Sequence, residues 1–282
     1  VTTTSGPGVA LKSETIGLAI SLELPLLVVD VQRGGPSTGL PTRTEQADLL
    51  MAMYGHHGES PLPIVAAYSP ADCFFAAIEA ARIALKYRTP VFLLTDGYLA
   101  NGAEPWLIPD VSALPDISVS FTTEPNHVDD DGTPSVWPYL RDPETLARPW
   151  VIPGTPGLEH RIGGIEKEDG RGNISYFPEN HEHMVHLRAE KIAGIANDIP
   201  PAEVVGDADD AEVLLVGWGS TWGAINGAME RVQERGRRVA HVHLTHLNPF
   251  PANLGEILRR YPKVVVPEMN LGQLSRLLRA EF

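Results

Sequence analysis

The sequence predicts an α/β protein with two Rossmann-like domains, each built on a parallel sheet. Strand and helix signals alternate over the first 100 residues, and the alternation returns from Ala211 onward. This order is typical of doubly wound parallel sheets. Runs such as "LPLLVVDV" and "TPVFLLTD" are apolar and rich in β-branched residues, as buried parallel strands are. With 282 residues, 43% of them hydrophobic, the chain is long enough for two ordinary domains.

The first 100 residues contain four expected strands and three expected helices. Ser69 and Pro70 form a pair typical of a helix N-cap and first helical position. Glycine-rich loops follow the first and second strands. In chain order, we expect a strand at 1–4, a helix at 9–23, a strand at 24–31, a helix at 45–54, a strand at 63–68, a helix at 69–87 and a strand at 89–96.

Residues 105–207 have a different character, because prolines and glycines abound and long periodic segments are scarce, as in "PWVIPGTPGLEHRIGG". Connectors without structure of their own rarely exceed about 15 residues in compact domains. We therefore expect ordered loops that pack on the core, with one helix near His181–Ala196. The second α/β region then contains, in order, a strand and turn at 212–220, a helix at 221–236, a strand at 237–244, a helix at 251–261 and a strand at 262–268.

Composition and charge exclude several classes of protein. The net charge is −14 and no basic face is visible, which argues against nucleic-acid binding. No stretch reaches the roughly 18 uncharged apolar residues that span a bilayer, and no signal-peptide pattern opens the chain. The lone Cys73 lies in an apolar helical pattern and is interpreted as a core residue. A cytoplasmic location is expected because no disulfide can form within the chain.

Three motifs raise binding hypotheses that the residues themselves do not favour. "GWGSTWG" at 217–223 could place a pyrophosphate at a helix N-terminus, but no acidic residue closes the next strand, so a tight β–α turn is favoured. "GGPSTG" lacks the Lys-Ser/Thr of a P-loop. The first two members of the group His181, His183 and His186 do not share a helix face, which favours surface histidines over a metal site. His241 and His243 share a strand face, which is weak evidence for a site, and for the strand end at His243–Pro249 structural and functional roles stay equally open.

Arg33 is the sharpest candidate for a binding residue. It follows an apolar strand at its carboxyl end, where open α/β sheets bind ligands, and Gly34 and Gly35 allow close backbone approach. A guanidinium recognises a carboxylate with two parallel hydrogen bonds. An ion pair with Asp30 or Glu45 is an equally favoured interpretation of the sequence.

Several long motifs together resemble the α subunit of the 2-oxoacid:ferredoxin oxidoreductases, most closely the 2-oxoglutarate type. The resemblance covers essentially the whole chain. The motifs are "VTTTSGPG", "VVDVQRGGPSTGLPTRTEQADL", "PVFLLTDGYLANG", "PYLRDPETLARPWVIPGTPGLEHRIGGIEK", "GNISYFPENH" and "VPEMNLGQL".

The resemblance implies an enzyme that uses thiamine diphosphate with Mg²⁺ to decarboxylate a 2-oxoacid. It transfers the acyl group to coenzyme A and passes two electrons to ferredoxin. Residues 1–195 would form an N-terminally incomplete pyrimidine-binding domain, and residues 208–282 a transketolase C-terminal-like domain. The diphosphate site and a [4Fe-4S] cluster would belong to a separate β subunit, in keeping with the single cysteine.

The resemblance also implies roles for particular residues. Arg33 matches the arginine that holds the substrate carboxylate, and Ser5, Gly6 and Pro7 match a loop beside the aminopyrimidine. No catalytic residue is expected within the chain, because the glutamate that activates the aminopyrimidine should lie upstream of Val1. We therefore interpret the chain as a fragment, and a mature product is the other possibility.

Three alternatives stay open at this point. The substrate could be pyruvate or a branched-chain 2-oxoacid, because Arg33 would recognise only the carboxylate that all 2-oxoacids share. The chain could instead bind a nucleotide through 217–223, or serve as a non-catalytic subunit that assembles the β subunit. The oligomeric state and the cellular electron acceptor are not determined by the sequence.

Overall fold

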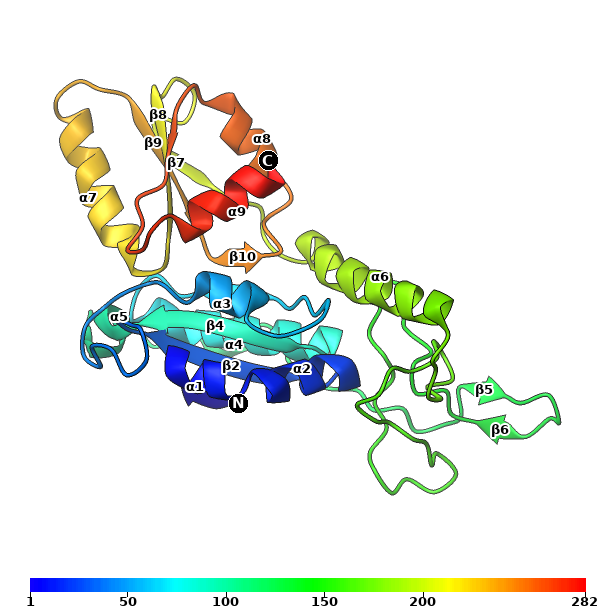
Figure 1. The fold of residues 1–282 in the computed structure, drawn as a ribbon. Helices are drawn as coiled ribbons and strands as arrows, with labels where there is room; N and C mark the ends of the chain where they lie inside the picture. The colour runs from blue at the N-terminus through cyan, green and yellow to red at the C-terminus, as the bar shows by residue number, and fades with distance from the viewer.

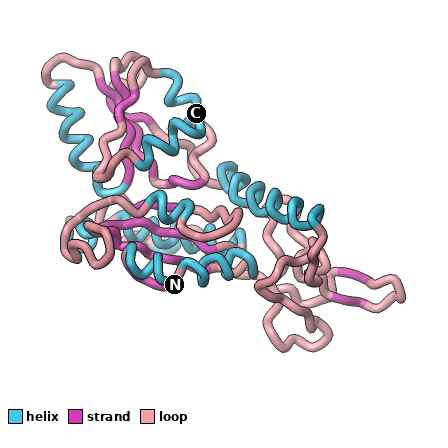
Figure 2. The backbone as a smooth tube through the Cα atoms, viewed as in Figure 1, coloured by secondary structure: helices cyan, strands magenta, loops and turns pink.

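The computed structural model describes residues 1–282 and contains two separate larger sheets. Figure 1 shows one sheet beneath the other, with the middle of the chain extending to one side. The tube in Figure 2 shows that most of this middle part is loop. No helix is both long and apolar enough to cross a membrane. The predicted α/β class with two parallel-strand sheets is confirmed.

The first sheet has the strand order β1-β2-β4-β3-β10, and its first four strands are parallel. All seven residues of β4 are buried, as the apolar sequence predicts for a central parallel strand. The elements of this region are β1 (Thr2–Thr4), α1 (Gly6–Leu11), α2 (Ser13–Leu22), β2 (Leu26–Gln32), α3 (Leu49–Tyr54), β3 (Ile64–Ala66), α4 (Asp72–Tyr87), β4 (Pro90–Asp96) and α5 (Gly97–Asn101).

The second sheet has the order β11-β8-β9-β7. The elements of this second region of the chain are β7 (Val204–Gly206), β8 (Val213–Trp218), the 3-10 helix η3 (Gly219–Thr221), α7 (Trp222–Gln233), β9 (Val239–Leu244), β10 (His246–Asn248), α8 (Leu254–Arg260), β11 (Val264–Val265) and α9 (Gln273–Glu281). Two edge strands depart from the purely parallel prediction: β7 is antiparallel to β9, and β10 leaves this region to pair antiparallel with β3 of the first sheet.

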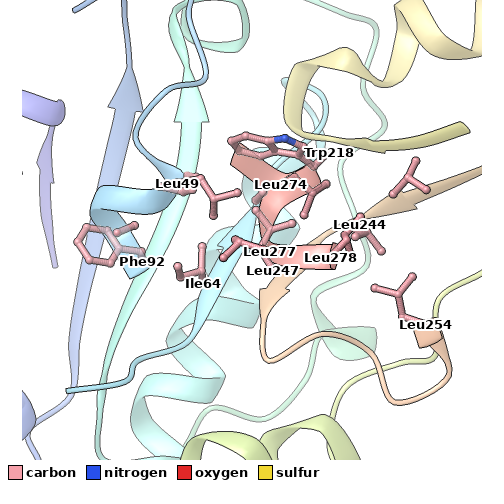
Figure 3. Packing of buried hydrophobic residues seen from close by; sticks show 14 of the residues in the cluster. Leu49, Ile64, Phe92, Trp218, Leu244, Leu247, Leu254, Leu274, Leu277 and Leu278 are labelled. Atoms are coloured by element: carbon pink, nitrogen blue, oxygen red, sulfur yellow. The ribbon is translucent and has the colours of Figure 1, made fainter. Parts of the chain in front are cut away.

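A single hydrophobic core joins the two sheets. Its 25 buried residues include Leu49, Ile64 and Phe92 from the first region and Trp218 and Leu274 from the second. Figure 3 shows these side chains together between the strands and α9. Because both regions bury apolar surface in the same cluster, each helps to fix the position of the other. The limits 1–195 and 208–282 for the two domains stay a prediction.

The middle of the chain packs less closely than expected. It contains η1 (Val111–Ala113), β5 (His127–Val128), β6 (Pro134–Ser135), α6 (Pro178–Gly194) and η2 (Ile195–Asn197). Ile192 and Ile195 pack into a second core cluster behind the first sheet, but the β5–β6 hairpin projects away from both sheets (Figure 1). The expectation that the whole region packs on the core was wrong for the hairpin, whose short strands bury little apolar surface.

A buried ion cluster fastens this middle region to the first sheet. Glu23, which ends α2 with a left-handed backbone, contacts Lys191 Nζ at 2.6 Å and Arg141 Nη2 at 2.5 Å. All three side chains are at most 6% exposed. Burial alone would raise the pKa of Glu23, but the adjacent Lys191 and Arg141 cations outweigh burial and lower the pKa to about 2.

The helix starts of the first region differ from the sequence prediction. The helix expected at 9–23 begins earlier, at Gly6, because Pro7 is favoured in a first helical turn, and it is interrupted at Lys12. The helix expected from Glu45 begins only at Leu49, since the preceding residues form contacts with both sheets described below. α4 begins at Asp72, although Ser69 Oγ still accepts a hydrogen bond from the Asp72 N–H at 3.2 Å.

Candidate active site

Three loops meet at the carboxyl edge of the first sheet. The strands are parallel and in register, with Thr4 opposite Asp30 and Gln32 opposite Asp96. The residues that follow β1, β2 and β4 therefore emerge at the same edge, which is where open α/β sheets bind ligands. Ser5 follows β1 and Arg33 follows β2, so the structure brings the two loops of the sequence prediction together.

Arg33 forms neither of the ion pairs that the sequence left open. Its Nε is buried and has no hydrogen-bond partner, and both Asp30 carboxylate oxygens lack a hydrogen-bond donor. Glu45 instead accepts a hydrogen bond from the Gly35 N–H at 2.9 Å. A buried donor without an acceptor is costly and needs an explanation, which an anionic ligand would supply.

The loop after Arg33 turns back on itself through backbone contacts. The Gly34 N–H donates to Arg43 O at 2.9 Å, and the Leu40 N–H donates to Gly34 O at 2.7 Å. Gly39 has φ +55°, and a Cβ there would lie 1.8 Å from Gly34 O, so only glycine fits. The glycines of this loop thus build a compact turn beside the arginine.

Ser5, Gly6 and Pro7 lie at the start of α1. The Ser5 side chain makes no capping hydrogen bond, so its hydroxyl is available to other partners. Gly6 packs directly on Asp48, because a Cβ at Gly6 would lie 2.8 Å from Asp48 Oδ2. A side chain larger than hydrogen at this position would therefore displace the Asp48 carboxylate.

Asp30 and Asp48 form a carboxyl pair behind this edge, which the sequence prediction did not identify. Asp30 is fully buried. Burial, followed by the nearby Asp48 charge, raises the pKa of Asp30 to about 8. Burial also raises the pKa of Asp48, although the contact with Asp30 and the Arg33 charge oppose this increase. A proton on Asp30 avoids placing two carboxylate charges side by side in a buried position. The signal in the sequence was an aspartate within the apolar run of β2.

Replacement of Asp30 by asparagine is expected to stabilise the protein at alkaline pH. The folded state keeps a proton on Asp30 up to about pH 8, whereas the unfolded chain releases it near the ordinary pKa of 3.8. Stability should therefore fall as pH rises between these values, and an amide cannot lose this proton. The measurement is the melting temperature of both proteins between pH 5 and pH 8.5.

The exposed Asp209 provides the matched control, since Asp209→Asn should leave the pH dependence of melting unchanged. A stability advantage of the wild type over Asp30→Asn that grows with pH would contradict the raised pKa of Asp30.

A polar network connects this edge to the second sheet. Gln46 is fully buried, and its Nε2 donates to Asp96 Oδ2 at 3.2 Å. The Ser220 hydroxyl also donates to Asp96, whose other oxygen accepts from the Tyr98 and Leu99 N–H groups at the start of α5. The roles of Gln46, Asp96 and Ser220 were not identified from the sequence, because their contacts join residues that are 50 or more positions apart.

The "GWGSTWG" segment is a tightly packed turn, as predicted. Gly219 has φ +58°, and a Cβ at Gly217 would lie 2.5 Å from Ile225 Cδ1. Trp218 is fully buried. The glycines therefore serve packing between β8 and α7. Nearby, His241 Nε2 lies 3.3 Å from His243 Nδ1. Burial lowers the pKa of His241 to about 4 and that of His243 to about 3.

The predicted surface histidines lie on α6. His181 Nδ1 contacts Glu166 at 2.6 Å, and His183 Nε2 contacts Asp169 at 3.2 Å. Both imidazoles are more than half exposed. Cys73 is half-buried at the start of α4, and burial raises the pKa of its thiol.

Comparison with known proteins identifies the family. Residues 1–175 match the family described as "Pyruvate flavodoxin/ferredoxin oxidoreductase, thiamine diP-bdg". The chain belongs to this oxidoreductase family. Residues 211–281 match "Pyruvate:ferredoxin oxidoreductase core domain II", so the two matches cover both α/β regions and leave α6 and its neighbours between them.

Two relatives are similar to this chain along nearly all of its length. A Mycobacterium tuberculosis protein named 2-oxoglutarate oxidoreductase subunit KorA is 61% identical over all of this chain and 42% of its own length. A Methanocaldococcus jannaschii protein named 2-oxoglutarate synthase subunit KorA is 34% identical over 97% of this chain and 70% of its own length.

A solved oxidoreductase structure shares the fold. The 2-oxoglutarate:ferredoxin oxidoreductase from Magnetococcus marinus, with 2-oxoglutarate, coenzyme A and succinyl-CoA bound, superposes with a TM-score of 0.89. It is 37% identical over 99% of this chain and 47% of its own chain. The present chain thus spans less than half the length of this enzyme and of the M. tuberculosis relative.

Proposed function

We propose that this chain is the cofactor-facing part of the α subunit of a 2-oxoglutarate:ferredoxin oxidoreductase. The observation that carries the proposal is the buried, unpartnered Nε of Arg33 at the carboxyl edge of the first sheet. This position calls for an anion, and the carboxylate of a 2-oxoacid has the planar shape that a guanidinium recognises.

The proposed reaction balances in atoms and electrons. A 2-oxoacid, coenzyme A thiol and two oxidised ferredoxins give acyl-coenzyme A, CO₂, two reduced ferredoxins and one proton. The bond between the carboxylate and the keto carbon breaks, and a thioester bond forms. Arg33 would orient the ketoacid before its carboxylate leaves as CO₂. It cannot hold that carboxylate too strongly, because stabilising the ground state as much as the transition state gives no acceleration.

The residues beside Arg33 fit the aminopyrimidine side of thiamine diphosphate. The Ser5 hydroxyl is not used in a helix cap, and Gly6 and Pro7 bring backbone to the same edge. We propose these three residues as cofactor contacts. When bound, the cofactor supplies the carbanion-stabilising chemistry of decarboxylation. The catalytic glutamate is proposed to lie upstream of Val1.

The remaining components are proposed to come from partners. Within the chain, no group of three or more His, Cys, Asp or Glu side chains is arranged to hold a metal ion. We propose that thiamine diphosphate and its Mg²⁺ are shared with the β subunit, which would carry the diphosphate-binding domain and a [4Fe-4S] cluster. Coenzyme A would be the co-substrate and ferredoxin the electron acceptor. A cytoplasmic complex without nucleic-acid or membrane partners completes the proposal.

The substrate preference can be tested on the full-length chain with its β subunit. In an anaerobic assay of coenzyme A-dependent dye reduction, we expect 2-oxoglutarate to give the highest kcat/KM of a panel with pyruvate and branched-chain 2-oxoacids. The names of the M. tuberculosis relative and of the M. marinus enzyme support this choice. A higher kcat/KM for pyruvate or a branched-chain acid would assign the chain to the corresponding type.

A further inference from the structure

Residues 45–50, here called the bridging segment, connect the two sheets. On one side the segment supports the candidate active site: the Glu45 carboxylate accepts from the Gly35 N–H at 2.9 Å, and the Asp48 N–H donates to Gln32 Oε1 at 3.1 Å. The Asp48 carboxylate also packs against Gly6. The positions of both predicted site loops therefore depend on this segment.

The other side of the bridging segment is held by the loop before α9 and by Gln273, the first residue of that helix. Asn270 Nδ2 donates to Gln46 O at 2.7 Å, and Gln273 Nε2 donates to Ala47 O at 2.7 Å. Gln273 Oε1 accepts from the Leu50 N–H at 3.0 Å. These side chains thus form hydrogen bonds with three backbone groups of the bridging segment. Most of the segment lies before α3 or in its first turn, where backbone groups lack partners within the helix.

Asn270 and Gln273 are themselves fixed in place. Asn270 Oδ1 accepts from the Gly272 and Gln273 N–H groups, both at 2.8 Å. The Glu268 carboxylate accepts from the Leu274 N–H at 2.8 Å and from the Ser275 N–H at 3.0 Å. It also accepts from Asn270 Nδ2 at 3.0 Å. A rigid loop of this kind can transmit its position to the bridging segment, as a pre-organised supporting shell does.

We propose that Asn270 and Gln273 are positioning residues for the reaction, which hold the Arg33 loop in place through the bridging segment. The inference rests on the proposed function of Arg33. Neither residue needs to touch substrate. Instead, the second α/β region fixes the geometry of a site built on the first, and small displacements of a positioned group reduce catalysis strongly.

The test uses the full-length α chain in complex with its β subunit. Gln273→Met removes both contacts at similar side-chain volume, and Gln273→Glu keeps the acceptor for the Leu50 N–H but loses the donor to Ala47 O. We expect Gln273→Met to raise KM for 2-oxoglutarate roughly 5- to 20-fold with a smaller change in kcat, and Gln273→Glu to restore part of this loss. Asn270→Ala should resemble Gln273→Met.

Hydrogen exchange gives a second readout that requires no substrate. Amides of residues 34–48 should exchange faster in Gln273→Met and Asn270→Ala, while those of β9 keep their protection. The matched control is Arg276→Ala, an exposed residue one turn along α9, which should change neither KM nor exchange.

Two results would overturn the inference. One is unchanged exchange of residues 34–48 in both variants, and the other is faster exchange with an unchanged KM. If the wild-type complex does not turn over any 2-oxoacid, the proposed function fails, but the exchange measurement still decides whether the second region holds the bridging segment.

Discussion

Replacement of Arg33 by alanine in the complete α/β complex is expected to lower kcat/KM for 2-oxoacids roughly 10- to 150-fold. The physical reason is the loss of a charge-assisted hydrogen bond to the substrate carboxylate, which is worth about 1.5–3 kcal/mol. The effect should appear mainly as a higher KM for every 2-oxoacid tested. Thiamine diphosphate affinity should change much less, because the proposed cofactor contacts are Ser5, Gly6 and Pro7.

Two further variants test the role of the planar guanidinium. Arg33→Lys should recover only part of the activity, because an ammonium keeps the charge but loses the two-pronged donor geometry. Arg43→Ala provides the matched control, since Arg43 is an exposed arginine on the same loop whose backbone carbonyl alone supports Gly34. A lower melting temperature for Arg33→Ala, with kcat/KM within about threefold of wild type, would show that Arg33 has a structural role instead.

Replacement of Glu23 by glutamine is expected to cost about 3–5 kcal/mol of stability, because it leaves the buried cations of Lys191 and Arg141 without their anion. Lys191→Met should cost less, since Glu23 keeps its contact with Arg141. The melting temperature of each variant measures the effect. The matched control is Glu212→Gln, which removes an exposed partner of Arg237 and should change stability by at most about 0.5–1 kcal/mol.

The stability difference between the wild type and Glu23→Gln should depend on pH. The folded pKa of Glu23, about 2, lies below its ordinary value of 4.5, so its contribution is present above pH 4.5 and is lost as pH falls toward 2. Glutamine has no such proton to bind. The stability difference between wild type and Glu23→Gln should therefore shrink in acid, and a difference that stays constant from pH 6 to pH 3 would contradict the assignment.

Local sequence pattern was sufficient where an element has one strong period or one strong composition. The apolar runs at 24–31 and 89–96 correspond to β2 and β4, and the amphipathic pattern ends α4 at Tyr87 as expected. It also placed Arg33 at the carboxyl end of its strand. Helix starts were less accurate, because capping depends on backbone contacts that a short window does not contain.

The candidate site was predicted only in its chain-local parts. The glycine-rich loops after β1 and β2 carry their own signal, as does an arginine that follows an apolar strand. The choice between a ligand-binding Arg33 and an ion-paired Arg33 could not be made from the sequence, because the order of residues does not show whether Asp30 or Glu45 faces Arg33 in space. In three dimensions, Asp30 faces Asp48 and Glu45 binds the Gly35 amide.

The sequence by itself therefore determined the α/β class, the four parallel strands of the first sheet and the place of Arg33 beside them. Tertiary structure decided the antiparallel edges formed by β7 and β10, the raised pKa of Asp30 beside Asp48, and the support of the bridging segment by Asn270 and Gln273. The physical reason is the distance along the chain over which each kind of interaction acts. Hydrophobic period and turn chemistry act over a few neighbouring residues, whereas these contacts pair groups that meet only when two sheets bury a common core.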